Sequence, residues 1–152
     1  MWKSLGLGLY VFGIIVCLMS NVQVPTAQEK NIIIRVMDGR NGKPMANMHL
    51  MVSLGSSQED VRELKSHVDL QTDLNGVALL SIDESTISRI QVWVDWHTLC
   101  QETPNTKSFS IEEIRKSGLS TPNNCGSVTR EKAPNHLTVF ARPAHFWEKL
   151  HR

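Results

Sequence analysis

The sequence predicts an all-β domain, an antiparallel sandwich of about seven strands with one short helix in a C-terminal insertion. Two observations indicate this fold. Short apolar runs alternate with polar residues, and turns rich in Gly, Asn, Asp and Pro separate these runs. At 152 residues the chain has room for one domain of ordinary size, and its hydrophobic content of 41% is sufficient for a core.

The first two expected strands flank a glycine turn. In the first, 32–37, alternate isoleucine and valine side chains can face a core while the residues between them face outward. The turn at 38–44 contains two glycines and an asparagine, which accept the positive φ angles of a chain reversal. It ends at a proline, which cannot donate to a strand ladder. The second strand is expected at 48–54.

The remaining expected strands follow the same alternation. The third runs through 64–72 and ends near an Asn-Gly pair at 75–76, a strong hairpin signal. The fourth strand returns at 77–82. A fifth at 90–96 turns its Ile and Val residues to one face, and the last strand is expected at 136–142.

One short helix is expected at about 111–117. Ser110 and Glu113 are spaced as a capping box, basic residues occupy the last turn, and Gly118 fits the position just past the end. The polar connection 55–63 is expected to be either an exposed loop tip or a single helical turn capped by one of its serines.

The turn motifs also carry a resemblance to a known family. The segments DGRNGKPMANM (38–48) and TDLNGV (72–77), each next to a strand, resemble the carboxypeptidase regulatory-like domain. The resemblance covers roughly residues 31–95 and implies a transthyretin-like (prealbumin-like) sandwich. Such domains are non-catalytic modules appended to metallocarboxypeptidases, so no peptidase activity is implied. The helix, the Asn-Cys-Gly loop and the closing segment resemble a layout that recurs in uncharacterised exported bacterial proteins, which implies one module over 31–152.

The N-terminus predicts a signal peptide over residues 1–27. One lysine precedes an uncharged apolar run of 15 residues at 5–19, which is shorter than the roughly 20 residues of a membrane span. The expected mature domain is 28–152, periplasmic or secreted. An uncleaved membrane anchor through 5–19 is the alternative, and lipidation at Cys17 is a third interpretation.

The charge balance argues against one class of partner. Without the single lysine of the signal segment, the chain keeps 15 of its 16 basic residues, and these equal its 15 acidic residues. A net charge of zero gives no electrostatic footprint for nucleic acid, so none is expected as a partner. Membrane contact is expected only through an uncleaved N-terminal segment.

Export makes the cysteines interpretable. Beyond the signal segment the chain holds Cys100 and Cys125, and an even pair in an oxidising compartment predicts one disulfide. It would pin the loop 98–135 to the end of the fifth strand. The alternative is a Cys100 thiolate nucleophile with His97 nearby.

No motif for catalysis, phosphate binding or metal binding is present, so we expect no enzyme, no cofactor and no metal site. Three of the six histidines, His49, His97 and His136, fall on the polar-facing sides of strands. Zinc would require them to converge on one sheet with suitable geometry.

The expected function is that of a non-enzymatic exported interaction or structural module, with an envelope protein or a polysaccharide as partner. The alternative is a carbohydrate-binding module. Its site would be an exposed Trp93 with Gln91, Asp95 and His97, unless the 98–135 insertion covers the tryptophan. Phe146, Trp147 and Leu150 at helical spacing form either a partner-binding tail or a turn that docks back on the domain.

Overall fold

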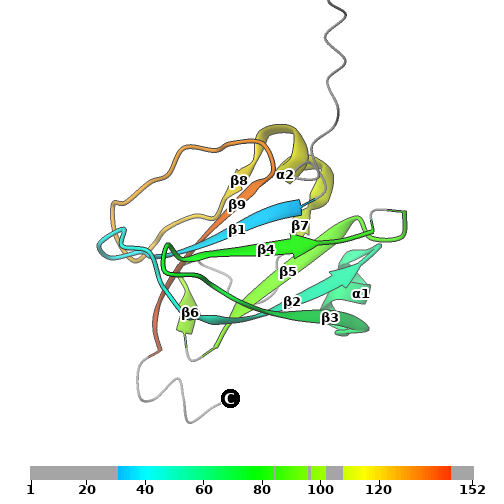
Figure 1. Cartoon of the computed structure of the whole chain (residues 1–152), viewed down its shortest axis with the longest axis horizontal. Helices are drawn as coiled ribbons and strands as arrows, with labels where there is room; N and C mark the ends of the chain where they lie inside the picture. Colours follow the sequence, from blue (N-terminus) through cyan, green and yellow to red (C-terminus); the bar gives the residue numbers. More distant parts are fainter. Residues whose placement is uncertain (1–30, 84, 96, 102–107, 145–152) are drawn as a thin grey trace, which may run out of the picture.

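The computed structural model describes residues 31–83, 85–95, 97–101 and 108–144. It confirms the all-β sandwich, with two sheets packed face to face (Figure 1). The first sheet contains, in order, β4 (Val77–Ser81), β1 (Asn31–Asp38), β9 (His136–Pro143) and β6 (His97–Leu99), and β8 (Leu119–Ser120) also pairs with β9. The second contains β3 (Ser66–Gln71), β2 (His49–Gly55), β5 (Arg89–Val94) and β7 (Phe109–Ser110).

The core lies between the two sheets and is built by the predicted alternation. Ile32, Ile34 and Val36 of β1 are fully buried, and so are Leu50 and Val52 of β2. Both sheets therefore turn these apolar side chains into the core, as the pattern of period two requires.

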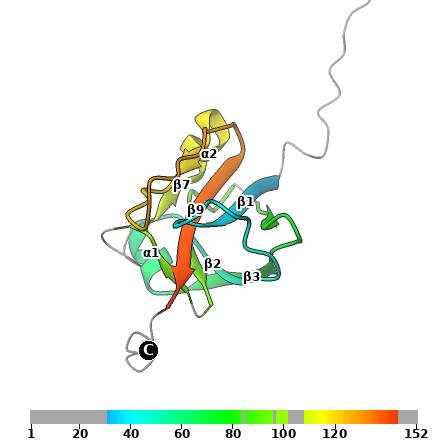
Figure 2. The same cartoon turned by 90° about the vertical axis from the view of Figure 1, so that its left-hand side faces the viewer.

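Three details differ from the prediction. The described residues form nine strands instead of about seven, because β6, β7 and β8 are only two or three residues long, too short to show a period. The first sheet is also not purely antiparallel, since β1 and β8 both run parallel to β9. Figure 2 shows β1 beside β9. A second helix, α1 (Gln58–Arg62), accompanies the predicted one.

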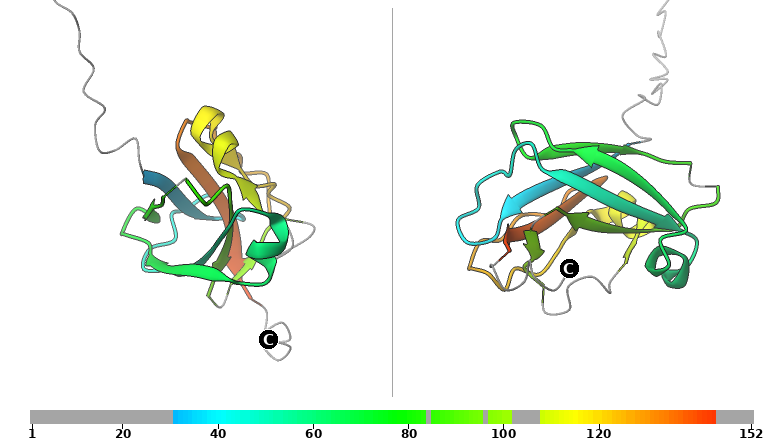
Figure 3. Two further views of the ribbon diagram at one scale, coloured as in Figure 1. Left: turned by 90° about the vertical axis from the view of Figure 1, so that its right-hand side faces the viewer. Right: turned by 90° about the horizontal axis from the view of Figure 1, so that it is seen from below.

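A serine caps the N-terminus of each helix. The helix α2 (Ile111–Ser117) has the predicted bounds, and the Ser110 hydroxyl accepts a hydrogen bond from the Glu113 amide. In α1, Ser57 and Asp60 form a reciprocal capping box, which confirms the helical-turn alternative for the 55–63 connection. Figure 3 shows α1 beside the β2 and β5 strands.

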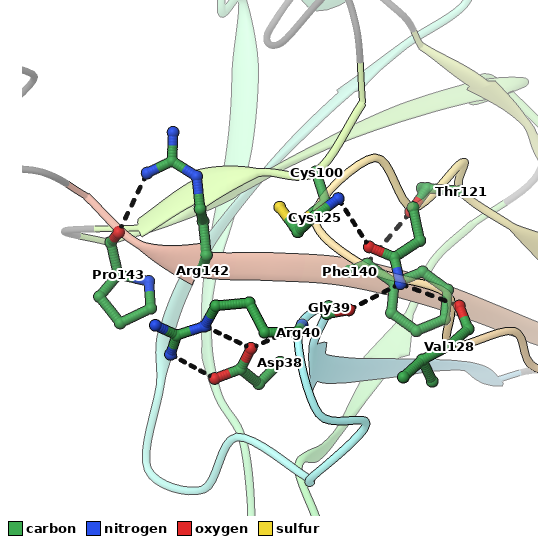
Figure 4. Close-up of a disulfide and its surroundings, with 11 residues drawn as sticks. Asp38, Gly39, Arg40, Cys100, Thr121, Cys125, Val128, Phe140, Arg142 and Pro143 are labelled. Atoms are coloured by element: carbon green, nitrogen blue, oxygen red, sulfur yellow. Dashed lines mark hydrogen bonds and ion pairs between the residues drawn. A yellow bond between two sulfur atoms is a disulfide. The ribbon is translucent and has the colours of Figure 1, made fainter.

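The predicted disulfide is present between Cys100 and Cys125, with their Cα atoms 5.3 Å apart (Figure 4). Cys100 follows β6, and Cys125 lies in the segment 121–135 that connects β8 to β9. Together with Met37 and Phe140, Cys100 forms a small second core on the outer side of the first sheet. The bridge therefore ties this connection to the sandwich, but at the end of β6 in the first sheet and not at the end of the fifth strand, where the sequence placed it.

The turn after β1 is held by a carboxylate. Asp38 is largely buried, and both its oxygens bind the guanidinium of Arg40, at 3.0 Å from Nε and 2.6 Å from Nη2 (Figure 4). Asp38 also accepts a hydrogen bond of 2.9 Å from the Arg40 amide. The hydrogen bonds from the Arg40 side chain and amide lower the pKa of Asp38, although partial burial opposes them.

We expect Asp38→Asn to lower the free energy of unfolding at pH 7 by about 1 kcal/mol, because the charge-assisted bonds to Arg40 are lost. A carboxyl whose pKa is lowered by folding stabilises the native state above its unfolded pKa of about 4 and loses this contribution as the pH falls through its folded pKa. Urea denaturation at pH 7 and at pH 2.5 should therefore show a smaller difference between variant and wild type at the lower pH. An equal difference at both values would contradict this role, and the exposed Glu59→Gln serves as the control.

Candidate binding surface

Trp93 lies on the outer face of the second sheet. Its neighbours Val92 and Val94 are buried in the core, so the tryptophan projects to the opposite side of β5. In register, Trp93 lies opposite Met51 of β2, and Met51 lies opposite Asp69 of β3. Trp93 and Met51 are half-buried, whereas Asp69 is exposed. Trp93, Met51 and Asp69 thus form a row across β5, β2 and β3, with two apolar side chains followed by a carboxylate.

The next row of the same face is polar. The His49 ring lies between two carboxylates, with Nδ1 2.8 Å from Asp95 Oδ2 and Nε2 3.7 Å from Asp69 Oδ1. All three side chains are at least half exposed. Their outer polar atoms are therefore accessible to a ligand that covers Trp93. We call these five residues, Met51, His49, Asp69, Trp93 and Asp95, the Trp93 surface.

The other end of this face is closed by α1. The hydroxyl of Ser53 donates a 2.7 Å hydrogen bond to the Val61 carbonyl of α1. Gln91, which pairs with Ser53 across the strands, is only 3% exposed. Of the residues expected around Trp93, Gln91 is thus buried and does not reach the ligand-accessible face.

His97 is also not one of the residues beside Trp93, although the sequence placed it there. It belongs to β6, which pairs with β9 in the first sheet, so the chain changes sheets between Asp95 and His97. The His97 ring keeps one contact with this region, because its Nδ1 lies 2.5 Å from the Asp95 carbonyl. Alternation along a single strand could not show this change of sheet.

The structure brings together residues that the sequence did not group. His49 and Met51 were on one face of the expected second strand, and Asp69 was in the third, but the pairing of these strands with β5 was not known. Only the order β3-β2-β5 places them beside Trp93. The tail residues Phe146, Trp147 and Leu150 lie outside the described residues, as does the segment 5–19.

His49 and His136 do not converge. His49 lies on the outer face of the second sheet and His136 on that of the first, because the buried Leu137 beside it points into the core. Within the described ranges, no group of three or more His, Cys, Asp or Glu side chains is arranged to hold a metal ion. In the same part of the chain, no helix is long and apolar enough to cross a membrane.

Comparison with protein-family models, with curated proteins and with solved structures found no match for this chain.

Proposed function

We propose that this protein is a non-enzymatic interaction module of the cell envelope or extracellular space, and that it binds its partner through the Trp93 surface. The half-buried Trp93 beside Met51 is the observation that carries the proposal. An aromatic ring that is fixed on a sheet and only partly covered offers a large contact area at a low cost in side-chain entropy.

The surroundings of the ring favour a carbohydrate as the ligand. Sugar C–H faces stack on aromatic rings, while sugar hydroxyls exchange hydrogen bonds with carboxylates and imidazoles. Asp69, His49 and Asp95 supply these groups beside the pair of Trp93 and Met51, and their side chains are at least half exposed. A flat ring with a polar rim is suited to a polysaccharide more than to an apolar peptide.

Two further observations support the other two parts of the proposal, namely that the protein is not an enzyme and that it is exported. Asp73 and Asp83 accept hydrogen bonds from the amides of their own turns, and Asp38 binds Arg40, so these carboxylates have structural partners. The Cys100–Cys125 disulfide is typical of proteins that fold in an oxidising compartment.

The test is binding to a panel of polysaccharides and peptidoglycan, with Trp93→Ala beside the wild type. We expect the variant to bind at least about tenfold more weakly, since buried aromatic anchors typically contribute more than 1.4 kcal/mol. Leu79→Ala is the matched control, because it removes a 58% exposed apolar side chain from the other sheet. Circular dichroism establishes that both variants are folded.

Other outcomes separate the alternatives. Unchanged glycan binding by a folded Trp93→Ala variant would disprove the assignment of the site. If no glycan binds, the carbohydrate interpretation fails for that panel. The interaction-module proposal then predicts that a partner captured from the envelope fraction by the wild type is lost with Trp93→Ala and kept with Leu79→Ala.

A further inference from the structure

A polar groove of about 550 Å³ lies on the outer face of the first sheet, away from the Trp93 surface. Its floor is formed by Arg35 of β1 and by His136 and Thr138 of β9. Its wall is the last part of the β8–β9 connection, residues 129–133. Figure 1 shows this connection as the ochre-to-orange loop that runs out beside the turn after β1 and returns to β9.

The strand register fixes the floor. Arg35 and Thr138 are paired residues of the parallel strands β1 and β9, so their side chains lie next to each other on one face. The flanking residues Ile34 and Val36 are fully buried in the core, which directs Arg35 outward. Arg35 is half-buried and Thr138 is 4% exposed, so the guanidinium rises from a well-packed floor.

The groove carries an excess of positive charge. Three permanent cations line it, Arg35, Arg130 and Lys132, against one carboxylate, Glu131. Arg40, Arg62 and Lys65, which lie outside the groove, each form an ion pair with a carboxylate near them in the sequence.

One further carboxylate, Asp73, is close enough to sense Arg35. The pKa of Asp73 is lowered mainly by the hydrogen bond from the Val77 amide and then by the Asn75 amide, with a smaller contribution from the charge of Arg35. Asp73 is thus engaged in its own turn, at 2.8 Å from each amide nitrogen, and does not pair directly with the guanidinium.

The segment that leads into the wall is tied to the sandwich at two points, and Ala133 at the end of the wall accepts a hydrogen bond from the His136 amide. The Asn123 side-chain amide donates to the carbonyls of Gly39 and Val128, at 2.8 and 2.9 Å. The disulfide at Cys125 fixes the same segment to the end of β6. Because both ends of the wall are anchored, its ordering around a ligand costs less entropy than that of a free loop.

We propose that this groove binds a ligand that carries an oxyanion, a phosphate, sulfate or carboxylate group on a molecule of sugar size. The planar guanidinium of Arg35 can bind two oxygens of such a group, Arg130 and Lys132 complete its charge, and the Thr129 and Thr138 hydroxyls can donate hydrogen bonds. The volume is in the range of small-molecule sites and exceeds that of a bare ion. A hollow of about 320 Å³ under the same loop, also lined by Thr129 and Arg130, can take an uncharged polar part of the ligand.

The test is an NMR titration of the oxidised, isotope-labelled protein with glucose 6-phosphate, glucose 6-sulfate and galacturonic acid, with glucose as the neutral reference. We expect saturable shifts of the amides of Arg35, His136, Thr138 and residues 129–133 with at least one of the three acids, and none with glucose. Which acid binds most tightly distinguishes phosphate, sulfate and carboxylate as the preferred group.

Two double variants with the same change in net charge make the test specific. Arg130→Gln with Lys132→Gln should weaken binding at least about tenfold, since two charged donors to the anionic group are lost. Arg62→Gln with Lys65→Gln, on or next to α1 at the other sheet, should change it less than about twofold. Arg35→Lys, which keeps the charge but loses the planar fork, should weaken it severalfold.

Equal weakening by the two double variants would overturn the proposal, because binding would then follow net charge alone. The absence of saturable shifts with all three acids would also overturn it. Trp93→Ala should bind the acids as the wild type does, so the outcome here is independent of the outcome for the Trp93 surface.

Discussion

Gly118→Ala is expected to lower the free energy of unfolding by at least about 3 kcal/mol. Gly118 ends α2 with a φ of 71° and a ψ of 167°, a combination that is essentially restricted to glycine and costs other residues about 1–3 kcal/mol. A Cβ atom there would lie 2.0 Å from the carbonyl oxygen of Ala133 and 2.6 Å from its carbonyl carbon. Both the backbone conformation and the contact therefore oppose a side chain.

The neighbouring backbone has little freedom to move away. The amides of Gly118 and Asn135 both donate to the Ile114 carbonyl, at 3.0 and 2.9 Å. The Arg115 guanidinium, in the last turn of α2, donates to the Asn31 carbonyl and to the Asn135 side chain, each at 3.1 Å. These bonds join the end of α2 to the beginnings of β1 and β9, so relief of the clash would disturb the sheet.

Chemical denaturation followed by circular dichroism measures this effect. The control is Ser117→Ala, one residue earlier on the exposed side of the helix, which we expect to change the free energy by less than about 0.5 kcal/mol. If the free energy of unfolding of Gly118→Ala were within about 1 kcal/mol of the wild-type value, the close approach of α2 to Ala133 would be disproved. From the sequence, Gly118 was expected only as a helix end, and the contact with Ala133 became evident in the structure.

Much of the fold could be predicted because its signals are local. Alternation of apolar and polar residues places Ile32, Ile34 and Val36 in the core, and the structure buries all three. The cap of α2 depends on Ser110 and Glu113, three residues apart, and the structure gives the helix its predicted bounds. Each of these inferences needs only neighbours within one turn or one strand.

The pairing of strands could not be predicted, because it joins distant parts of the chain. β1 pairs in parallel with β9 about one hundred residues later, and no periodic pattern records which strands become neighbours. For the same reason, the helical turn at 55–63 could be considered from the sequence, but its position over the sheet face that holds Gln91 could not. The sheet change between Asp95 and His97 is likewise a tertiary event.

The two candidate sites show this limit clearly. The sequence placed Trp93 on an outward-facing side of its strand, and the structure agrees, but the cross-strand partners Met51 and Asp69 required the strand order. No pattern in the sequence predicted the polar groove around Arg35 on the first sheet. Its wall is a segment without periodicity, and Arg35 is one of several scattered charges until β9 pairs beside it.

Removal of the disulfide by Cys100→Ser with Cys125→Ser is expected to destabilise the protein by about 3.5 kcal/mol. The bridge spans 25 residues, and closing a loop of this length restricts the unfolded chain by that amount in the chain-entropy model. In the native state it lies against Gly39, where a Cβ atom would come within 2.6 Å of the Cys100 sulfur. The sulfurs are thus closely packed, and their replacement by hydroxyls adds a desolvation cost.

A comparison with and without dithiothreitol separates the bridge from the packing of its atoms. Reduction should lower the denaturation midpoint of the wild type, with two additional titratable thiols, and leave the midpoint of the double variant unchanged. Hydrogen exchange should increase most in residues 121–130, because Cys125 anchors this segment to the end of β6. If fully reduced wild type kept its midpoint, the remaining bonds of Asn123 to Gly39 and Val128 would be sufficient to hold the loop. The bridge would then contribute little to the stability of the fold.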